Sequence, residues 1–224
     1  MAQTEKGLFE LQYNSAQVDF ENGNKEVALN KVNEIIRLNS TYIDAYYLRG
    51  RIYFDDLKYK EALSDFNYLI GKMPKGSPDI YVERGLVHAA MKNYGLAIED
   101  YTQAIIIKDD HILAYIQRGY CYFEIDEYNK SKNDLDNALL IDPYNSYALY
   151  IRGYLHVYGL ANDQLAINDF TRLLDVDASY YDAYYDRGNA YLNLQLDDKA
   201  CADFEIAASN GIQDAIGLMD EFCK

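Results

Sequence analysis

The stretch Tyr-Ile-Gln-Arg-Gly at residues 115–119 is one copy of a motif, Tyr-x-x-Arg-Gly, that recurs along the chain. Other copies begin at Tyr46, Tyr81 and Tyr184, and a fifth copy begins at Leu149, with Leu in place of Tyr. The glycines that close successive copies are 35, 34, 34 and 35 residues apart. A period this constant indicates a repeat architecture, in which each unit stacks on its neighbours.

Two further columns of residues keep the same period. A small residue follows each glycine by twelve positions, and a large apolar residue lies four positions beyond it. The small residues are Ala62, Ala97, Ser131, Ala166 (displaced by one) and Ala200, and the large ones are Phe66, Tyr101, Leu135, Phe170 and Phe204. These spacings place the columns on single faces of two successive helices. Small side chains then let the paired helices cross closely, while the large ones fill the volume beside them.

The two ends of the chain are less regular. A weaker first copy holds Ala16, Ala28 and Val32 in the same columns, as end repeats often do. The tail carries apolar residues at helical spacing, which predicts a helix that caps the last repeat. These residues are Ala215, Ile216, Met219 and Phe222. Turns are expected at residues 22–24 and 92–93, and Pro74 and Pro143 are expected to end second helices.

A helix pair of 34 residues with aromatic, Gly, Ala and terminal Pro columns resembles the tetratricopeptide repeat. The resemblance covers roughly Phe9 to Ile212, although Tyr stands where this family often has Trp. It implies an all-α fold, a right-handed α-solenoid of about six helix pairs with a C-terminal capping helix. We expect one solenoid domain over residues 1–224. Its repeats are predicted at about 9–42, 43–77, 78–111, 112–145, 146–180 and 181–212, with the capping helix at 213–222.

Each Arg of the motif is matched by an Asp just before the large apolar column. The pairs are Arg49 with Asp65, Arg84 with Asp100, Arg118 with Asp134, Arg152 with Asp169, and Arg187 with Asp203. The first copy has Ser15 and Lys31 at these places, so both members are missing together, which suggests contact. We expect bidentate ion pairs that fix the helix crossings. The alternative is that the arginines line a ligand groove.

The resemblance also implies a binding surface, because first helices line the concave face in this family. Its usual contact positions, carried over residue by residue, are Tyr47, Arg51, Phe54, Tyr120, Phe123, Tyr150, Tyr154, Tyr185 and Asn189, with Tyr158 at a further position. Tyrosine-rich surfaces are typical of protein interfaces. The same rings could instead pack between repeats, and the sequence leaves both readings open. The lysines of the family's carboxylate clamp are missing, with Tyr13, Tyr47 and Val82 among the residues at those positions.

The sequence contains no motif for catalysis, metal binding or cofactor binding. His88 and His156 fall in an aromatic column and are expected to be packed and hydrogen-bonded rather than catalytic. Three cysteines, Cys121, Cys201 and Cys223, lack metal-ligand spacing and are expected to be reduced thiols. We therefore expect no enzyme activity, no cofactor and no metal.

The chain is acidic, with a formal net charge of −15. This charge disfavours nucleic acid and anionic membrane surfaces, and it favours a neutral to basic partner. No stretch approaches the roughly 18 apolar residues of a membrane span, and Met1 to Leu11 lacks the apolar core of a signal peptide. These features favour a soluble, cytoplasmic protein. The alternative is an exported protein whose signal peptide was removed, so the sequence leaves the compartment open.

The function that these features predict is a non-enzymatic scaffold that binds a peptide or helix of a partner protein in a tyrosine-rich concave groove. One alternative is a structural protein that assembles with copies of itself as a homo-oligomer. A second alternative is an enzyme with an unrecognised site.

Overall fold

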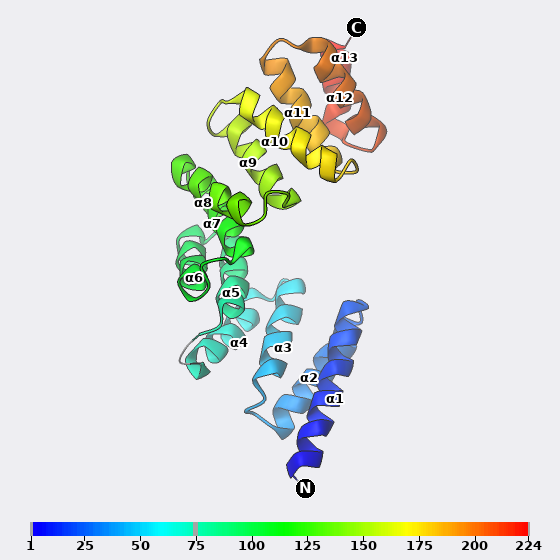
Figure 1. The fold of residues 1–224 in the computed structure, drawn as a ribbon. Coiled ribbons are helices and arrows are strands. Elements are labelled where there is room, and N and C mark those ends of the chain that lie inside the picture. The colour runs from blue at the N-terminus through cyan, green and yellow to red at the C-terminus, as the bar shows by residue number, and fades with distance from the viewer. Residues whose placement is uncertain (1, 74–75, 224) are drawn as a thin grey trace. The chain divides into compact units, whose positions relative to one another are not determined.

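The structure is a computed structural model that describes the backbone of residues 2–73 and 76–223, and side chains from Gly7 onward. Pro74, expected to end a second helix, lies outside the described residues, and α8 ends two residues before Pro143. The described residues form thirteen α-helices and no strand (Figure 1). They alternate as six helix pairs followed by one helix, which confirms the predicted all-α solenoid with a C-terminal helix.

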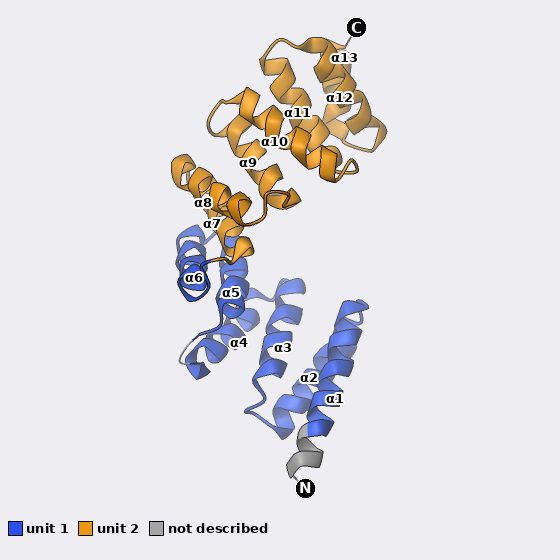
Figure 2. Ribbon diagram, viewed as in Figure 1, with its two compact units in different colours: residues 1–109 blue, residues 110–224 orange. Residues whose placement is uncertain are grey.

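The helices fall into two compact units, residues 1–109 and 110–224 (Figure 2). Unit 1 contains α1 (Ala2–Glu21), α2 (Lys25–Leu38), α3 (Ile43–Asp55), α4 (Tyr59–Lys72), α5 (Pro78–Ala90) and α6 (Tyr94–Ile107). Unit 2 contains α7 (Ile112–Glu124), α8 (Tyr128–Ile141), α9 (Ser146–Tyr158), α10 (Asp163–Val176), α11 (Tyr181–Asn193), α12 (Asp197–Ser209) and α13 (Gln213–Phe222). The single domain expected over the whole chain stays a prediction, and each unit is described by itself.

The repeat glycines lie directly against the large side chains of the second helices. A Cβ atom added to Gly188 would come within 2.5 Å of the Phe204 ring, and one added to Gly153 within 2.7 Å of the Phe170 ring. Gly50 and Gly85 are as close to Phe66 and Tyr101. Any side chain at these positions would therefore push the two helices of a pair apart. The glycine and large-residue columns of the sequence are thus the two sides of one helix contact.

The turn inside each pair places one residue at positive φ. In the first pair this residue is Gly23, with φ 80°, and the expected turn at residues 22–24 is confirmed. Lys92 has φ 60° in the other expected turn. The remaining turns use Leu57, Asp126, Ala161 and Gln195. The loop with Ala161 follows α9, and an extra residue there accounts for the displaced Ala166.

The predicted ion-pair ladder is present in all five strong repeats. Arg118 donates from Nε and from a terminal nitrogen to the two carboxylate oxygens of Asp134, at 2.7 Å each. The same two-pronged contact joins Arg49 to Asp65, Arg84 to Asp100, Arg152 to Asp169, and Arg187 to Asp203. In the first repeat Lys31 donates to Ser15 at 2.7 Å and also binds Asp19. The weak copy therefore contains a smaller cationic contact at the same place.

A further hydrogen bond to the second helix of the preceding repeat is made by Arg49, Arg84, Arg152 and Arg187. Arg49 donates to Asn33 at 2.9 Å, and Arg152 donates to Asp136 at 2.7 Å. The other two acceptors are Asn67 for Arg84 and Thr171 for Arg187. Each such guanidinium thus links both helices of its own repeat to the repeat before it, which supports a role in stacking.

The last helix, α13, packs on α12 as predicted, but with a different set of side chains. Ala215 is fully buried, and Leu218 and Met219 pack against the buried face of α12. Ile216 and Phe222, which were expected to cover that face, are 43% and 44% exposed. The helix is rotated so that the i, i+3, i+4 set of 215, 218 and 219 faces inward.

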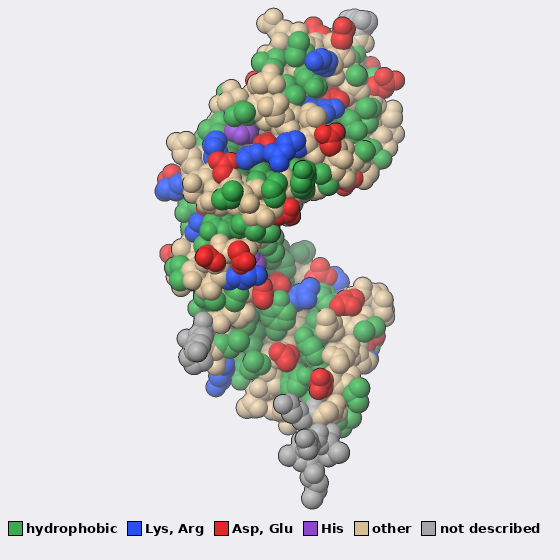
Figure 3. All heavy atoms as spheres, viewed as in Figure 1, with side chains coloured by type: hydrophobic (Ala, Val, Ile, Leu, Met, Phe, Trp, Pro, Cys, Tyr) green, Lys and Arg blue, Asp and Glu red, His purple; other side chains and the backbone are tan. Residues whose placement is uncertain are grey.

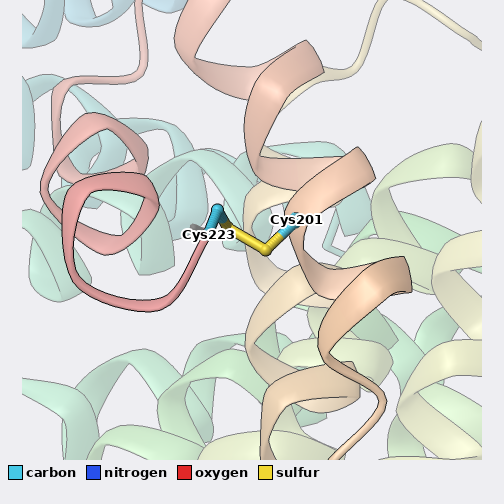
Figure 4. Close-up of a disulfide and its surroundings, with 2 residues drawn as sticks. All are labelled: Cys201 and Cys223. Atoms are coloured by element: carbon cyan, nitrogen blue, oxygen red, sulfur yellow. A yellow bond between two sulfur atoms is a disulfide. The ribbon is translucent and has the colours of Figure 1, made fainter.

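A disulfide joins Cys201 of α12 to Cys223 just after α13 (Figure 4). The prediction of three reduced thiols is therefore wrong for two of them, and only Cys121 is a free, buried thiol. The two bonded cysteines are 22 residues apart, with no short spacing motif, and only the packing of α13 on α12 brings their Cα atoms to 5.6 Å. The bond ties the end of the chain to the last helix pair.

Candidate functional site: the tyrosine-rich first-helix surfaces

In unit 1 the candidate residues lie on α3, and two of them, Tyr47 and Arg51, contact Glu83 of α5. The Tyr47 hydroxyl donates a 3.1 Å hydrogen bond to Oε1 of Glu83, a residue of α5. The Arg51 Nε atom lies 3.5 Å from the same oxygen, and the Arg51 guanidinium lies 5.9 Å from the centre of the Tyr47 ring. Tyrosine, acid and cation therefore form one compact group.

The same side of unit 1 contains a pocket of 250 Å³. Its lining includes Tyr47 together with the carboxylates of Asp44 and Asp79 and the apolar side chains of Ile43 and Ile80. Phe54, the third candidate of α3, packs on Tyr59 with ring centres 6.0 Å apart and contributes to the unit's apolar core. Tyr47 therefore lines this pocket, whereas Phe54 packs against the core of unit 1.

In unit 2 three tyrosines of α9 form a continuous row, which we call the α9 tyrosine row: Tyr150, Tyr154 and Tyr158. Their spacing of four residues places them on one face of the helix. Ring centres are 6.3 Å apart between Tyr150 and Tyr154, and 4.3 Å apart between Tyr154 and Tyr158. Phe123 of α7 meets Tyr154 edge-on at 5.4 Å, so the row continues onto the neighbouring first helix.

A buried acid of α11, Asp186, lies beneath this row. Its side chain accepts a 2.7 Å hydrogen bond from the Tyr158 hydroxyl and a 3.0 Å hydrogen bond from the Tyr150 hydroxyl. Asn189, one turn further along α11, donates to the Tyr158 hydroxyl at 3.2 Å. Asp186 itself is only 3% exposed. Three successive first helices, α7, α9 and α11, are therefore connected through this group.

The electrostatics of the group are those of a carboxylate removed from water. Burial raises the pKa of Asp186 from its usual 3.8 to about 6, although the two tyrosine hydrogen bonds act in the opposite direction. Burial and the nearby Asp186 charge raise the pKa of both Tyr150 and Tyr158, so both hydroxyls stay protonated donors. Asp182 adds a second negative charge that also raises the pKa of Asp186.

Two other tyrosine candidates of unit 2, Tyr120 and Tyr185, are half-buried and contact apolar cores. Tyr185 lies against Phe204, with ring centres 6.2 Å apart, and belongs to the core between α11 and α12. Tyr120 packs against the main apolar core of the unit. Tyr150 and Phe123 also pack against that core, whereas Tyr158 is exposed. Packing between helices is thus present at these rings, and ligand binding by the candidates stays a prediction.

Asp186 was missed by the sequence reasoning, although a signal was present. It occupies the position before the motif arginine, where other repeats have Leu48, Gln117 or Ile151. Only Glu83 is a second acid there, and it too accepts a hydrogen bond from a tyrosine 36 residues earlier. An acidic residue in a column that is otherwise uncharged is therefore the signal that could have identified Glu83 and Asp186 from the sequence.

The second-helix side of unit 2 has a larger cleft of 640 Å³, lined by Lys132, Asp136, Arg152, His156, Asp169 and Arg172, among others. Figure 3 shows basic side chains gathered over α10 on the face in view. These side chains already have partners: Lys132 and Arg152 bind Asp136, and Arg172 donates to the carbonyl oxygen of Pro143 and lies 4.0 Å from Asp169. The cleft is therefore lined by one ion pair of the ladder, Arg152 with Asp169, and by its charged neighbours.

The two histidines of the aromatic column are packed, as predicted, but the expected hydrogen bonds are not found among the described residues. His156 is 3% exposed, and its Nε2 atom lies 4.0 Å from Asp169. The Nδ1 atoms of His88 and His156 are buried with no hydrogen-bond partner within the described part of the chain. Burial lowers the pKa of both histidines, which favours neutral rings.

Among the residues that the structure describes, no group of three or more His, Cys, Asp or Glu side chains has a geometry suited to a metal ion. Over the same residues, no helix combines the length and the apolar character that crossing a membrane requires.

Comparison with known families assigns the repeats. A family model described as tetratricopeptide repeat matches residues 78–111 and 112–145, and a second model of the same description matches residues 162–215. Together the matches cover more than half of the chain. The chain belongs to the tetratricopeptide repeat family. Tetratricopeptide repeat proteins are in general non-enzymatic scaffolds that bind protein partners.

Individual proteins match this tetratricopeptide repeat protein either over a short stretch or at low sequence identity. DnaJ homolog subfamily C member 7 of Homo sapiens is 32% identical over 78 residues, which is 34% of this chain and 16% of that relative. A tetratricopeptide repeat protein from Parabacteroides merdae has a TM-score of 0.73 at 19% identity, covering 95% of this chain and 84% of that one. YrrB, described as a TPR protein with an unusual peptide-binding site, has a TM-score of 0.61 at 22% identity, covering 77% and 88%. At such identities the structural likeness shows the fold alone.

Proposed function

We propose that this tetratricopeptide repeat protein is a scaffold that binds an extended segment or a helix of a partner protein on its tyrosine-rich first-helix surfaces. Tyr120, Phe123, Tyr150, Tyr154, Tyr185 and Asn189 form the surface in unit 2, and Tyr47, Arg51 and Phe54 form the surface in unit 1. Its mechanism is apolar contact with the rings, joined by hydrogen bonds to tyrosine hydroxyls.

The observation that carries this proposal is the α9 tyrosine row. The hydroxyls of Tyr150 and Tyr158 are held by Asp186, and the rings contact one another and Phe123. The rings are thus fixed before any partner arrives. Binding to a rigid surface loses less conformational entropy than binding to a mobile one, so a pre-arranged row of rings is suited to recognition.

The charge of the chain supports a neutral to basic partner. The formal net charge is −15, and Asp44, Asp79 and Asp182 lie at or near the two surfaces. Acidic surroundings raise the association rate of a basic segment and lower that of an acidic one. The peptide-binding site in the description of YrrB belongs to a protein of the same fold, and it makes a peptide the natural class of ligand to test first.

The test is selection of a random-peptide display library on the full chain, followed by titration of the selected peptides. The double variant Tyr120→Ala plus Tyr154→Ala removes two rings from the unit-2 surface. We expect it to weaken peptide binding at least tenfold, about 1.4 kcal/mol or more, since buried aromatic contacts dominate interfaces. Equal affinity for wild type and double variant would remove the surface assignment.

The matched control is Tyr144→Ala. Tyr144 is 69% exposed in the loop between α8 and α9 and is not one of the candidate residues. This variant should bind the selected peptides as wild type does. Light scattering of the free chain at several concentrations tests self-assembly, because a chain that stays monomeric at high concentration removes that alternative.

A further inference from the structure

Asp186 differs from the other buried aspartates of the chain. Within the described residues six aspartates are buried: Asp65, Asp100, Asp134, Asp169, Asp186 and Asp203. Five of them accept two-pronged hydrogen bonds from the motif arginines. Asp186 has only the neutral hydroxyls of Tyr150 and Tyr158 as partners. Burying a carboxylate without a cation costs free energy, and a positive charge brought close to it from outside would be strongly attracted.

The chain itself shows which group fits beside such an acid. In unit 1, Tyr47 donates to Glu83, which lies 36 residues later in the sequence, and in unit 2 Tyr150 donates to Asp186, again 36 residues later. In unit 1 the position four residues after the tyrosine is Arg51, whose Nε lies 3.5 Å from Glu83. In unit 2 the same position is Tyr154. The cation is therefore present in one copy of the arrangement and replaced by a ring in the other.

We propose that the α9 tyrosine row with Asp186 is a subsite for a basic side chain, Lys or Arg, supplied by the partner segment. The incoming cation takes the role that Arg51 plays in unit 1. This inference rests on the proposed function, and it names the chemistry that the unit-2 surface selects.

Two contacts are open to such a cation. The ring faces of Tyr154 and Tyr158, 4.3 Å apart at their centres, attract a cation through their negative π faces. The hydroxyls of Tyr150 and Tyr158 commit their protons to Asp186, and the Tyr158 oxygen also accepts from Asn189. The Tyr150 oxygen keeps lone pairs that can accept from an ammonium or guanidinium group. Asp186 supplies the charge through these hydroxyls. A neutral side chain of equal length gains neither interaction.

The exposed fractions permit such an approach. Tyr158 is 44% exposed, while Asp186 is 3% exposed. The ligand therefore meets the rings and hydroxyls first and the carboxylate only through them. The other charged group that acts on Asp186 is Asp182, of the same helix, which is also negative and adds to the attraction.

The probes are blocked pentapeptides, acetyl-Gly-Gly-X-Gly-Gly-amide, in which X is lysine, arginine or uncharged norleucine. Binding is followed on the full chain by NMR of carbon-13-labelled tyrosine rings, assigned with Tyr154→Phe and Tyr158→Phe. We expect saturable shifts of the Tyr154 and Tyr158 signals with the lysine and arginine peptides and none with norleucine. Equal shifts with norleucine, or no shifts with either basic peptide, would overturn the proposal.

Two variants with opposite designs, and one control variant, sharpen the test. Asp186→Asn removes the charge and should weaken binding of the basic probes at least about tenfold. Asp175→Asn removes an exposed carboxyl from α10 and should leave the probe affinity unchanged. Tyr154→Arg recreates the arrangement of unit 1 inside unit 2, so the chain's own guanidinium should occupy the subsite and abolish probe binding. If Asp186→Asn does not fold, Tyr154→Arg carries the comparison.

Failure of this inference is distinguishable from failure of the proposed function. If display-selected peptides need Tyr120 and Tyr154 but bind Asp186→Asn as tightly as wild type, the surface binds partners and the basic subsite is wrong. If the selected peptides ignore both tyrosines, the surface assignment itself is wrong. Enrichment of Lys or Arg at one peptide position, lost in selections on Asp186→Asn, is the result that supports both.

Discussion

The Tyr158 hydroxyl donates a 2.7 Å hydrogen bond to Asp186, a carboxylate of the neighbouring first helix that is 3% exposed. The contact joins α9 to α11 beside the α9 tyrosine row. It also places an ionisable group where water cannot stabilise its charge, and this arrangement makes the stability of unit 2 dependent on pH.

Asp186→Asn should change how stability varies with pH. The pKa of Asp186 is about 6 when folded against 3.8 ordinarily, so the folded chain holds the proton more tightly than the unfolded chain. Wild type therefore loses stability relative to the variant as pH rises from about 4 to about 6, by roughly 3 kcal/mol in total. The neighbouring Asp182 and the tyrosine hydroxyls are the same in both proteins. Melting temperatures of the two proteins across pH 4 to 7 (about the range in which the group titrates) give the difference; a constant difference would contradict the prediction.

Arg118→Ala should destabilise the chain while leaving peptide binding unchanged. Removing the guanidinium leaves the buried Asp134 carboxylate without its partner, a change that typically costs about 3–5 kcal/mol. Arg37→Ala is the control, because Arg37 is largely exposed in its pair with Glu34 and its loss should change stability little. Chemical denaturation measures both. Loss of peptide affinity without loss of stability would instead place Arg118 in the ligand surface.

Alanine at two glycines should have opposite effects. A Cβ on Gly188 would come within 2.5 Å of the Phe204 ring, and we expect Gly188→Ala to destabilise by about 1–3 kcal/mol. Gly95 lies in α6 with no neighbour within 4 Å of an added Cβ, so Gly95→Ala should stabilise by about 0.5–1 kcal/mol. Thermal unfolding of both variants gives the signs, and a shared sign would contradict the packing described here.

Reduction should loosen the C-terminal helix. The Cys201–Cys223 bond closes a chain segment of 22 residues, and loss of such a bond typically costs about 3 kcal/mol. Hydrogen exchange in α13 should therefore speed up in reductant or in Cys223→Ser, with little change in α9. Thiol titration of the oxidised chain should find one free cysteine after unfolding and none before, since Cys121 is buried and its pKa is raised to about 12. Three reactive thiols in the oxidised, unfolded chain would contradict the disulfide.

The fold could be predicted because its signals are periodic. Gly153 and Phe170 fall in columns that recur at nearly constant spacing, and a helix pair converts that spacing into one contact. The same holds for Arg118 and Asp134: a pair that is present or absent together in each repeat indicates contact before any coordinates are known.

Other features depend on relations that no period expresses. The Cys201–Cys223 bond requires the rotation of α13, and the apolar residues of that helix fit two different inward faces. The sequence column marks Asp186 as unusual, but its burial and its partners Tyr150 and Tyr158 come only from the structure, because a carboxylate on a helix is ordinarily solvated. Whether Tyr185 projects or packs depends on Phe204 in the next helix. Tertiary contacts made once, rather than in every repeat, therefore had to come from the structure.

The third bond of the motif arginines limits how the repeats can be exchanged. Arg152 reaches back to a charged acceptor, Asp136, whereas Arg49 and Arg187 reach back to the neutral Asn33 and Thr171. A repeat moved to another place in the array would keep its own arginine but meet a different acceptor. The contacts between repeats therefore depend on the order of the repeats. A shortened or shuffled chain has to keep each arginine donor next to the repeat that supplies its acceptor.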